Sequence, residues 1–546
     1  MLLALRFLEI GIKLYFCFQG CRTTILLKVA MDRKYPIGIQ DFGEIRKGGY
    51  VYVDKTELLF RLVNTGKYYF FGRPRRFGKS LMISTLESYF EGRKELFEGL
   101  AMEKLEKQWS VSPVLHLDLN NQEYNSRKSL EDILNDYLTR WEKLYGSEAS
   151  ETSPSLRFAG VIRRASEKTG QNVAILIDEY DKPLIQSLED EELQSEYRSI
   201  LKAFYGNLKT CDKYIRFALL TGVTRFSRVS IFSDLNNLND ITMDASFASL
   251  CGISETELIP NFGQDIQALA LRLKVTYDQA CDLLRKRYDG YHFVQDTEGM
   301  YNPFSILNTF YRMQPENYWF STGTPTILVK LLQKNHYRLS DLADNAEATA
   351  DELTGLENLD HNPIPLFFQS GYLTIKQYDP EFRNYNLGFP NQEVEQGFMD
   401  FLMPRYMNMG GRNASFHIMS FVKEMRSGRI DAFMSRLQSF FADTPYELIR
   451  DHELHYQNVL FILFRLLGFY CEAEYHTSQG RIDLVVKTSG YIYVMEFKFE
   501  GTAEEALAQI EARNYAKPFA SDGRTVYEIG VNFSRDTRNI EKWVIG

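Results

Sequence analysis

The residues best suited to chemistry follow an aromatic run near the start of the chain. The segment YYFFGRPRRFGKSL, residues 68–81, ends in the triplet Gly78, Lys79 and Ser80. A phosphate-binding loop has the pattern G-x-x-x-x-G-K-[ST], in which the lysine reaches the β- and γ-phosphates and the hydroxyl holds Mg²⁺. Arg73 stands where that pattern has its first glycine, which serves the turn more than the chemistry. The segment therefore predicts a nucleotide site with an altered first position, set between a strand and a helix N-terminus that favours an anion.

An acidic motif further along the chain supplies the second half of such a site. In NVAILIDEYDKPL, residues 172–184, an apolar run leads directly into Asp178 and Glu179. A buried strand that ends in an acid places it at the carboxyl edge of a sheet, beside the phosphates. We expect Asp178 to hold Mg²⁺ through water and Glu179 to act as general base. A core strand ending in an acidic turn is the alternative, and the upstream loop favours the catalytic interpretation.

A third apolar run, IRFALLTGV at 215–223, places Thr221 where it could sense the γ-phosphate. Arg225 follows shortly after and could contact a phosphate bound to the same chain, as an arginine acting in cis. Arg75 and Arg76 could add charge at the loop, although a solvated surface cation is the alternative for each arginine. The base could lie against the segment 50–59, where Asp54 or Thr56 could instead cap a helix. The predicted nucleotide-binding residues are Arg73, Pro74, Arg75, Arg76, Phe77, Gly78, Lys79, Ser80, Asp178, Thr221 and Arg225, and the cofactors are ATP and Mg²⁺.

A second constellation lies near the C-terminus. The run GRIDLVVKTSGYIYVMEFKFEG, residues 480–501, reads as two strands joined by a turn at Ser489 and Gly490. Alternation puts Glu496 and Lys498 on one face, and Asp483 lies near the cross-strand partner of Glu496. Two carboxylates can hold a divalent cation, and a lysine can orient or activate water. These residues predict a metal-dependent nuclease site with Asp483 and Glu496 as metal ligands.

The surroundings of this hairpin support the interpretation. Both acids lie within apolar strands, where an unneeded charge is costly. Helical segments at 455–470 and 503–519 flank the strands, and a further strand follows at 525–533. Gln509 on the second helix joins the predicted catalytic residues Glu179, Asp483, Glu496 and Lys498, and Glu453 is a weaker candidate metal ligand. A retained fold with a degenerate site is the alternative.

Several motifs together resemble a known family. PIGIQDFGEIRKGGYVYVDKT, RPRRFGKSL, LIDEYDKPL and GVTRFSRVSIFSDLNNLNDIT are similar to the AAA-ATPase-like family of bacterial proteins, which commonly carry a C-terminal PD-(D/E)xK nuclease-like domain. The usual loop of that family is R-P-R-R-F-G-K-S, so the resemblance makes Arg73 its normal residue. The likeness runs from about Tyr35 to the C-terminus. It includes YDGYHF at 288–293, YNPFSIL at 301–307 and QSGYLTI at 369–375, to which we assign no chemistry.

The pattern of elements predicts an α/β fold with three parts: a P-loop NTPase parallel-sheet domain, a helical, winged-helix-like middle region, and a restriction-endonuclease-like α/β domain. We expect these parts at 31–243, 244–410 and 451–546, with a helical linker at 411–450. Residues 1–30 are an apolar extension interrupted by charges, and we expect translation to begin at Met31. That extension lacks a run long enough to span a membrane and a clear signal-peptide cleavage site.

Composition limits the functions open to this chain. The 546 residues carry a formal net charge of −9, which argues against a generally basic nucleic-acid coat but allows a local basic groove. The six cysteines form no C-x-x-C pair, which favours the reducing cytoplasm over a disulfide framework or a zinc knuckle.

The sequence therefore predicts an ATP-binding and ATP-hydrolysing protein joined to a metal-dependent nuclease that acts on nucleic acid, DNA rather than RNA. The alternative is a protein in which ATP drives a conformational change, with self-association as one form of that change. In this alternative the last domain only binds a partner. A small-molecule kinase is less favoured because no separate substrate-binding motif is visible.

Overall fold

The computed structural model describes most of the chain beyond residue 32: 33–225, 237–322, 325–344, 346–356, 359, 361–407, 411–442, 452–468, 472–478, 481–498, 501–534 and 539–546. The N-terminal extension, and with it the expected start at Met31, lies outside the described residues. The chain divides into two compact units that interleave along the sequence. Unit 1 holds the chain up to Gly323 together with Glu347–Gln392, and unit 2 holds Thr324–Ala346 and Glu393–Gly546.

Unit 1 is built on a five-stranded sheet in the order β2-β3-β4-β1-β5, and every neighbouring pair is parallel. Its strands are β1 (Tyr68–Gly72), β2 (Val114–Asp118), β3 (Val173–Asp178), β4 (Ile215–Gly222) and β5 (Asn239–Asp240). All residues of β1 and β3 are buried, as the continuous apolar runs require of strands covered on both faces. The predicted parallel sheet is confirmed.

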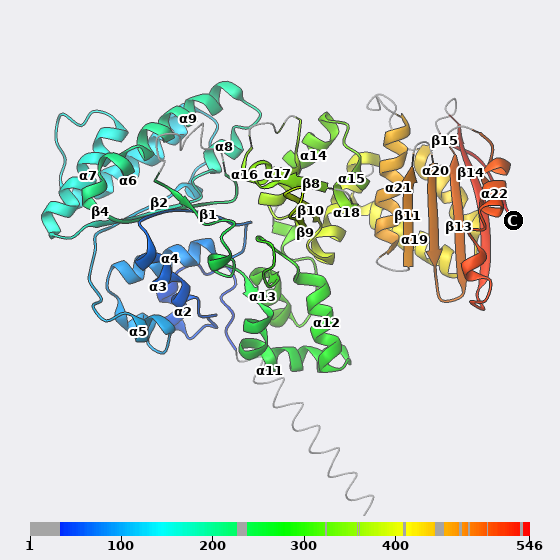
Figure 1. Ribbon diagram of the computed structural model, residues 1–546, viewed down its shortest axis with the longest axis horizontal. Coiled ribbons are helices and arrows are strands. Elements are labelled where there is room, and N and C mark those ends of the chain that lie inside the picture. Colours follow the sequence, from blue (N-terminus) through cyan, green and yellow to red (C-terminus); the bar gives the residue numbers. More distant parts are fainter. Residues whose placement is uncertain are drawn as a thin grey trace, which may run out of the picture. The chain divides into compact units, whose positions relative to one another are not determined.

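Helices cover both faces of this sheet, and Figure 1 shows α6, α7 and α9 on one side with α2, α3 and α4 on the other. They are α2 (Phe42–Gly48), α3 (Thr56–Thr65), α4 (Lys79–Phe90), α5 (Ala101–Leu105), α6 (Arg127–Tyr145), α7 (Pro154–Thr169), α8 (Lys182–Gln186), α9 (Glu191–Tyr205) and α10 (Asn207–Thr210). Helix α4 is the one that matters most for the site, because it begins at Lys79 directly after the loop that leaves β1.

The middle of unit 1 is mainly helical, as expected. It contains α11 (Glu255–Leu273), α12 (Tyr277–Tyr288), α13 (Pro303–Arg312), α16 (Ala350–Thr354) and α17 (Ile364–Gln369). Short strands accompany them: the pair β6 (Ile253–Ser254) and β7 (Met300–Tyr301), and the sheet β8-β10-β9 formed by β8 (Ala346–Thr349), β9 (Thr374–Asp379) and β10 (Asn384–Gly388).

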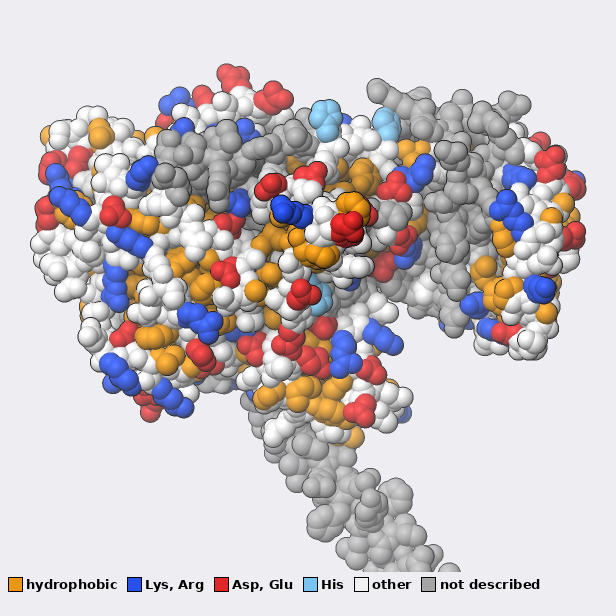
Figure 2. Space-filling model, in the orientation of Figure 1, with side chains coloured by type: hydrophobic (Ala, Val, Ile, Leu, Met, Phe, Trp, Pro, Cys, Tyr) orange, Lys and Arg blue, Asp and Glu red, His pale blue; other side chains and the backbone are white. Residues whose placement is uncertain are grey.

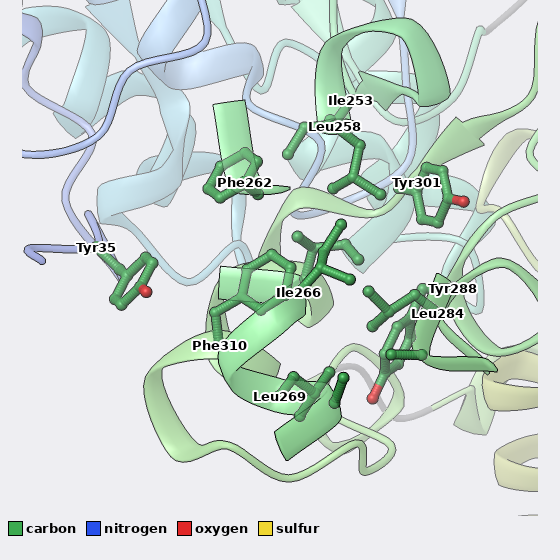
Figure 3. Close-up of a cluster of buried hydrophobic side chains, with 13 residues drawn as sticks. Tyr35, Ile253, Leu258, Phe262, Ile266, Leu269, Leu284, Tyr288, Tyr301 and Phe310 are labelled. Atoms are coloured by element: carbon green, nitrogen blue, oxygen red, sulfur yellow. The ribbon is translucent and has the colours of Figure 1, made fainter. Parts of the chain in front are cut away.

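Helix α11 shows how the sequence builds this region. A capping box between Ser254 and Glu257 satisfies its first backbone N–H groups, and Leu258, Phe262 and Ile266 recur every fourth residue. Figure 3 shows the resulting cluster, in which side chains of α11, α12 and α13 gather around Ile266 with Tyr35 at the edge. The segment around Tyr35 is thereby packed against the helical region.

Unit 2 has a five-stranded mixed sheet in the order β11-β12-β13-β14-β15, in which only β13 and β14 run parallel. The strands are β11 (Glu472–Ser478), β12 (Arg481–Lys487), β13 (Tyr491–Lys498), β14 (Thr525–Ser534) and β15 (Asn539–Ile545). The helices are α14 (Thr326–Lys334), α15 (Leu339–Asp344), α18 (Gln392–Met407), α19 (Gly411–Arg426), α20 (Ile430–Ala442), α21 (His452–Gly468) and α22 (Ala503–Ala512). The run from α21 to β14 has the order α-β-β-β-α-β, in which β11 precedes the two strands of the predicted hairpin.

Two helices lie on opposite faces of this second sheet. The Tyr493 hydroxyl donates a hydrogen bond to the carbonyl of Met425 in α19, whereas the neighbouring Ile492 packs against Ile510 of α22. Successive residues of a strand point to opposite faces, so β13 is buried on both sides. Among the described helices of both units, none is long and apolar enough to cross a membrane.

Surface charge is mixed over the face that Figure 2 shows, where lysine and arginine side chains are interspersed with aspartate and glutamate. This pattern agrees with the negative net charge of the chain. On the face that Figure 2 shows, lysine and arginine side chains do not form a broad basic surface.

Candidate functional site

The loop between β1 and α4 has the backbone of an anion-binding turn. Arg76 and Gly78 both have positive φ, at 67° and 102°, and Gly78 forms the N-cap of α4. Glycine adopts this conformation freely, whereas arginine does so at a cost of about 1 kcal/mol or more. Residues of alternating handedness turn successive backbone N–H groups toward one concave side, which binds anions.

Lys79 points back into this loop. Its side chain is 3% exposed, and Nζ donates to the carbonyl oxygens of Arg73 at 3.0 Å and Pro74 at 3.4 Å. The same ammonium lies 3.4 Å from a carboxylate oxygen of Glu179. Two residues that the sequence assigned to the phosphates and to the general base are therefore in contact.

The acids of β3 lie at the carboxyl edge of the sheet. Asp178 is buried, and its carboxylate accepts hydrogen bonds from the Thr221 hydroxyl and from the backbone N–H of Glu179, the latter at 3.0 Å. Glu179 has a φ of 52°, a conformation that costs a non-glycine residue energy and is concentrated at functional sites. The structure thus brings together Lys79, Asp178, Glu179 and Thr221, while the half-buried Ser80 follows Lys79 in the first turn of α4.

Arg73 is placed differently from the loop's other arginines. Its side chain is 1% exposed and donates to the carbonyl oxygens of Gly72 at 2.9 Å, Thr242 at 2.7 Å and Ala248 at 3.3 Å. The guanidinium also lies between two rings, 4.4 Å from that of Phe71 and 4.2 Å from that of Phe293. Burial lowers the pKa of Arg73 to about 10. The Arg73 side chain therefore holds the loop to the core, and the place of Arg73 among the predicted nucleotide-binding residues stays a prediction.

The remaining arginines are nearer the solvent. Arg75 and Arg76 are exposed, and the guanidinium of Arg76 lies 4.8 Å from the ring centre of Phe304. Arg225 forms an ion pair with Asp240, and its backbone N–H donates to the Gln369 side chain at 2.8 Å. Arg225 therefore faces a carboxylate of β5, a contact that the sequence pattern did not indicate.

Asp181 is a buried acid that the sequence interpretation passed over. Its carboxylate accepts hydrogen bonds from the backbone N–H groups of Val223 at 3.1 Å and Thr224 at 2.6 Å, and from the Thr224 hydroxyl at 2.6 Å. Burial, with a smaller contribution from the negative charge of Glu179, raises the pKa of Asp181 to about 6. Asp181 connects the turn after β3 to the end of β4. The only sequence feature that could have indicated this role is its position as the third acid of LIDEYD.

A largely apolar cavity of about 100 Å³ adjoins the loop. Its lining includes Tyr52 and Lys55 before α3, Gly78 and Met82 around the start of α4, and Phe262 and Leu307 from α11 and α13. The Lys55 ammonium contacts the Glu257 carboxylate at 2.5 and 2.6 Å, so one side of the cavity is tied to α11. Asp54 accepts a hydrogen bond from the Thr56 N–H at 2.9 Å in the turn before α3, whose N-cap residue is Lys55 and has no side-chain capping bond.

Three motifs to which the sequence gave no chemistry surround the same loop. Tyr291 and Phe293 of YDGYHF pack edge-on against Phe77, with ring centres 4.8 and 5.4 Å apart. Phe304 of YNPFSIL underlies Arg76. Gly371 of QSGYLTI approaches Pro74 so closely that a Cβ there would lie 2.7 Å from the proline Cβ. Tertiary contacts, invisible in the sequence alone, give these motifs a place at the site.

The hairpin of unit 2 has the register that the second constellation needs. Asp483 on β12 pairs directly with Glu496 on the antiparallel β13, so both residues belong to one face of the sheet. The Glu496 side chain is completely buried, and Lys498, two residues on, is half-buried. The side chains of Asp483 and Glu453 lie outside the described residues, although their strand and helix are described.

Helix α22 lies directly against β14 beside this hairpin. Gly530 pairs with Glu496, and a Cβ at Gly530 would lie 2.1 Å from the Ala503 carbonyl oxygen and 2.5 Å from the Leu507 nitrogen. Only glycine fits such an approach, which brings α22 and its half-buried Gln509 to the strand beside Glu496. Within the part of the chain that the structure describes, which omits the Asp483 side chain, no three His, Cys, Asp or Glu residues are grouped to hold a metal.

Comparisons with known proteins match both regions. A family model described as "Predicted AAA-ATPase" matches residues 36–232, and one described as "PD-(D/E)XK nuclease superfamily" matches residues 451–543. A protein of Azotobacter chroococcum mcd 1, described as "Uncharacterized protein in vnfD 5'region", is 35% identical over 526 residues that cover 94% of this chain and 99% of that protein. The likeness to this relative therefore spans both units.

Proposed function

The chain belongs to the AAA-ATPase-like family and ends in a PD-(D/E)XK nuclease-superfamily domain. We propose that it hydrolyses ATP and uses the nucleotide to control a metal-dependent nuclease. The observation that carries the proposal is the contact of Lys79 with Glu179 at the loop where Asp178 meets Thr221. In our proposal the P-loop part spans 31–243, the helical part 244–410, the linker 411–450 and the nuclease part 451–546.

The residues at the sheet edge fit a magnesium nucleotide. The Ser80 hydroxyl and the Asp178 carboxylate are the hard oxygen donors that Mg²⁺ prefers, and the Thr221 hydroxyl orients Asp178. The cation would neutralise charge on the phosphates. Lys79 would exchange the carbonyls of Arg73 and Pro74 for phosphate oxygens, and this movement would leave Glu179 able to accept a proton from the attacking water.

The cavity beside Gly78 fits the nucleobase. Its lining is mostly apolar, and it opens next to the backbone on which the phosphates would lie. A flat, weakly polar ring is the natural occupant of such a cavity. Because Phe262 and Leu307 come from the helical region, a bound base would connect the loop to α11 and α13.

The hairpin of unit 2 fits a divalent cation for cleavage of a phosphodiester. Asp483 and Glu496 share one face, and burial of the Glu496 carboxylate is costly unless a cation offsets its charge. Lys498 and Gln509 would orient water and stabilise charge on the phosphate. DNA is the proposed substrate, and the reducing cytoplasm is the proposed compartment. The competing function is that unit 2 only binds a partner, and the negative net charge of the chain favours this alternative.

Two activities measured on the full chain test this proposal. Phosphate release from ATP and Mn²⁺-dependent cleavage of plasmid, single-stranded DNA and RNA are compared for the wild type, Lys79→Ala and Lys498→Ala. We expect Lys79→Ala to lose ATP hydrolysis, and Lys498→Ala to lose cleavage while it still hydrolyses ATP. The exposed lysines Lys128 and Lys517 provide matched control variants to alanine.

Three outcomes count against the proposal. Cleavage that survives in EDTA would contradict the metal-dependent mechanism. Equal cleavage by the wild type and Lys498→Ala would remove the nuclease site from the hairpin. Absence of both cleavage and Mn²⁺ binding in the wild type would favour the binding module.

A further inference from the structure

A tryptophan from a distant segment holds the backbone of the phosphate-binding loop. The indole N–H of Trp319 donates to the carbonyl oxygen of Arg75 at 3.0 Å, and the Trp319 side chain is only 6% exposed. Trp319 follows α13, so no local sequence pattern connects it to the loop. We propose that Trp319 is a positioning residue for the phosphate-binding loop, and this inference rests on the ATP-binding function proposed above.

The contact acts through the geometry of one peptide group. In a trans peptide the carbonyl and the following N–H point in opposite directions. Since the Arg75 carbonyl faces the indole, the Arg76 N–H is turned away from it, toward the opposite side of the loop. Arg76 also has the positive φ that a concave anion site needs. Trp319 therefore fixes the direction of a backbone donor that would meet a phosphate.

The indole is itself held in place by aromatic neighbours. Its ring centre lies 5.3 Å from that of Tyr372 and 6.4 Å from that of Tyr291. Tyr291 packs on Phe77, whose carbonyl oxygen accepts a hydrogen bond from the Gly252 N–H at 3.1 Å. The loop is thus supported from two further directions, and the Trp319 side chain has little freedom to release Arg75.

A purely structural tryptophan and a positioning tryptophan predict different results. If Trp319 is only structural, its replacement lowers the free energy of unfolding and weakens the binding of all ligands of unit 1 together. A positioning role selectively weakens ligands that carry phosphates, because adenosine would occupy the cavity beside Gly78 without using the Arg76 N–H.

Trp319→Phe tests this difference, because phenylalanine keeps an aromatic ring and removes the donor. We expect the Kd for Mg-ATP to rise about three- to tenfold, the effect of one net hydrogen bond, while the Kd for adenosine changes less than twofold. Trp141→Phe is the matched control, since Trp141 is a 7% exposed residue of α6 that packs on Phe158 and has no part in the loop. Both variants are studied as full chains by equilibrium dialysis.

Hydrogen exchange of the loop amides gives a second readout that needs no ligand. We expect faster exchange across residues 75–77 in Trp319→Phe than in the wild type or Trp141→Phe. Unchanged ATP affinity with unchanged exchange, or equal weakening of ATP and adenosine, would overturn the role of Trp319. A wild-type chain that binds no ATP would instead refute the proposed function, and the exchange measurement would still decide whether the indole orders the loop.

Discussion

Gly371 offers a sharp test of how the QSGYLTI motif supports the nucleotide loop. Gly371 has a φ of 87°, and a Cβ added there would lie 2.7 Å from the Pro74 Cβ and 2.8 Å from its Cγ. Nonbonded carbon atoms prefer about 3.5–4.0 Å, so Gly371→Ala would have to push the proline ring away by roughly 1 Å. Pro74 lies within the loop, so this displacement reaches the phosphate-binding backbone.

Gly170→Ala is the matched control. Gly170 ends α7 with a φ of 67°, and a Cβ there would meet nothing within 4 Å. Both variants carry the cost of about 1–2 kcal/mol for a left-handed alanine. Only Gly371→Ala adds the overpacking, about 1–3 kcal/mol, so we expect its free energy of unfolding to be lower than that of Gly170→Ala by this amount.

Catalysis should separate the two variants further. A misplacement of about 1 Å in a positioning group can reduce a rate by roughly 100-fold. We expect Gly371→Ala to lose about 10- to 100-fold in ATP hydrolysis, measured by phosphate release, and Gly170→Ala to stay within about twofold of the wild type. Urea unfolding followed by tryptophan fluorescence supplies the stability values. Equal stability and equal hydrolysis in the two variants would refute the contact of Gly371 with the loop.

Three further predictions concern charged groups. Arg73→Met should lower the free energy of unfolding by about 2–3 kcal/mol in urea, because three backbone carbonyls lose their donor, whereas the exposed Arg75→Met should change it by less than about 0.5 kcal/mol. The raised pKa of Asp181 means that the folded chain binds more protons than the unfolded chain between about pH 4 and 6, so this residue's contribution to stability falls as pH rises through that window. Asp181→Asn should remove this contribution to the pH dependence of the free energy of unfolding. If urea titrations give the same difference between wild type and variant at every pH from 4 to 7, the raised pKa of Asp181 is contradicted. Glu496→Gln should abolish Mn²⁺-dependent cleavage of plasmid and leave ATP hydrolysis intact, and retained cleavage would exclude Glu496 as a ligand.

Local pattern was enough to predict much of the architecture. Continuous apolar runs predicted β1 and β3 as buried parallel strands, because helices on both faces of a parallel sheet bury every residue of such strands. Alternation in the C-terminal run predicted that Glu496 and Lys498 share a face. Each of these inferences depends on neighbours within one strand, which the sequence displays directly.

The details that escaped prediction depend on residues far apart in the chain. Arg73 turns inward because the carbonyls of Thr242 and Ala248 receive its guanidinium, and those partners lie about 170 residues away. Trp319 reaches Arg75 across a still longer separation of 244 residues. Periodicity carries no information about such contacts, so the sequence indicated neither the inward direction of the Arg73 side chain nor a role for Trp319.

Equilibrium binding of Mg-ATP to the full chain tests the central claim most directly. We predict saturable binding to the wild type and to Lys128→Ala, and a Kd about 100-fold higher for Lys79→Ala, because the buried ammonium is the charged group aimed into the loop. Identical binding by Lys79→Ala and the wild type would contradict the assignment of the loop as the site of the nucleotide.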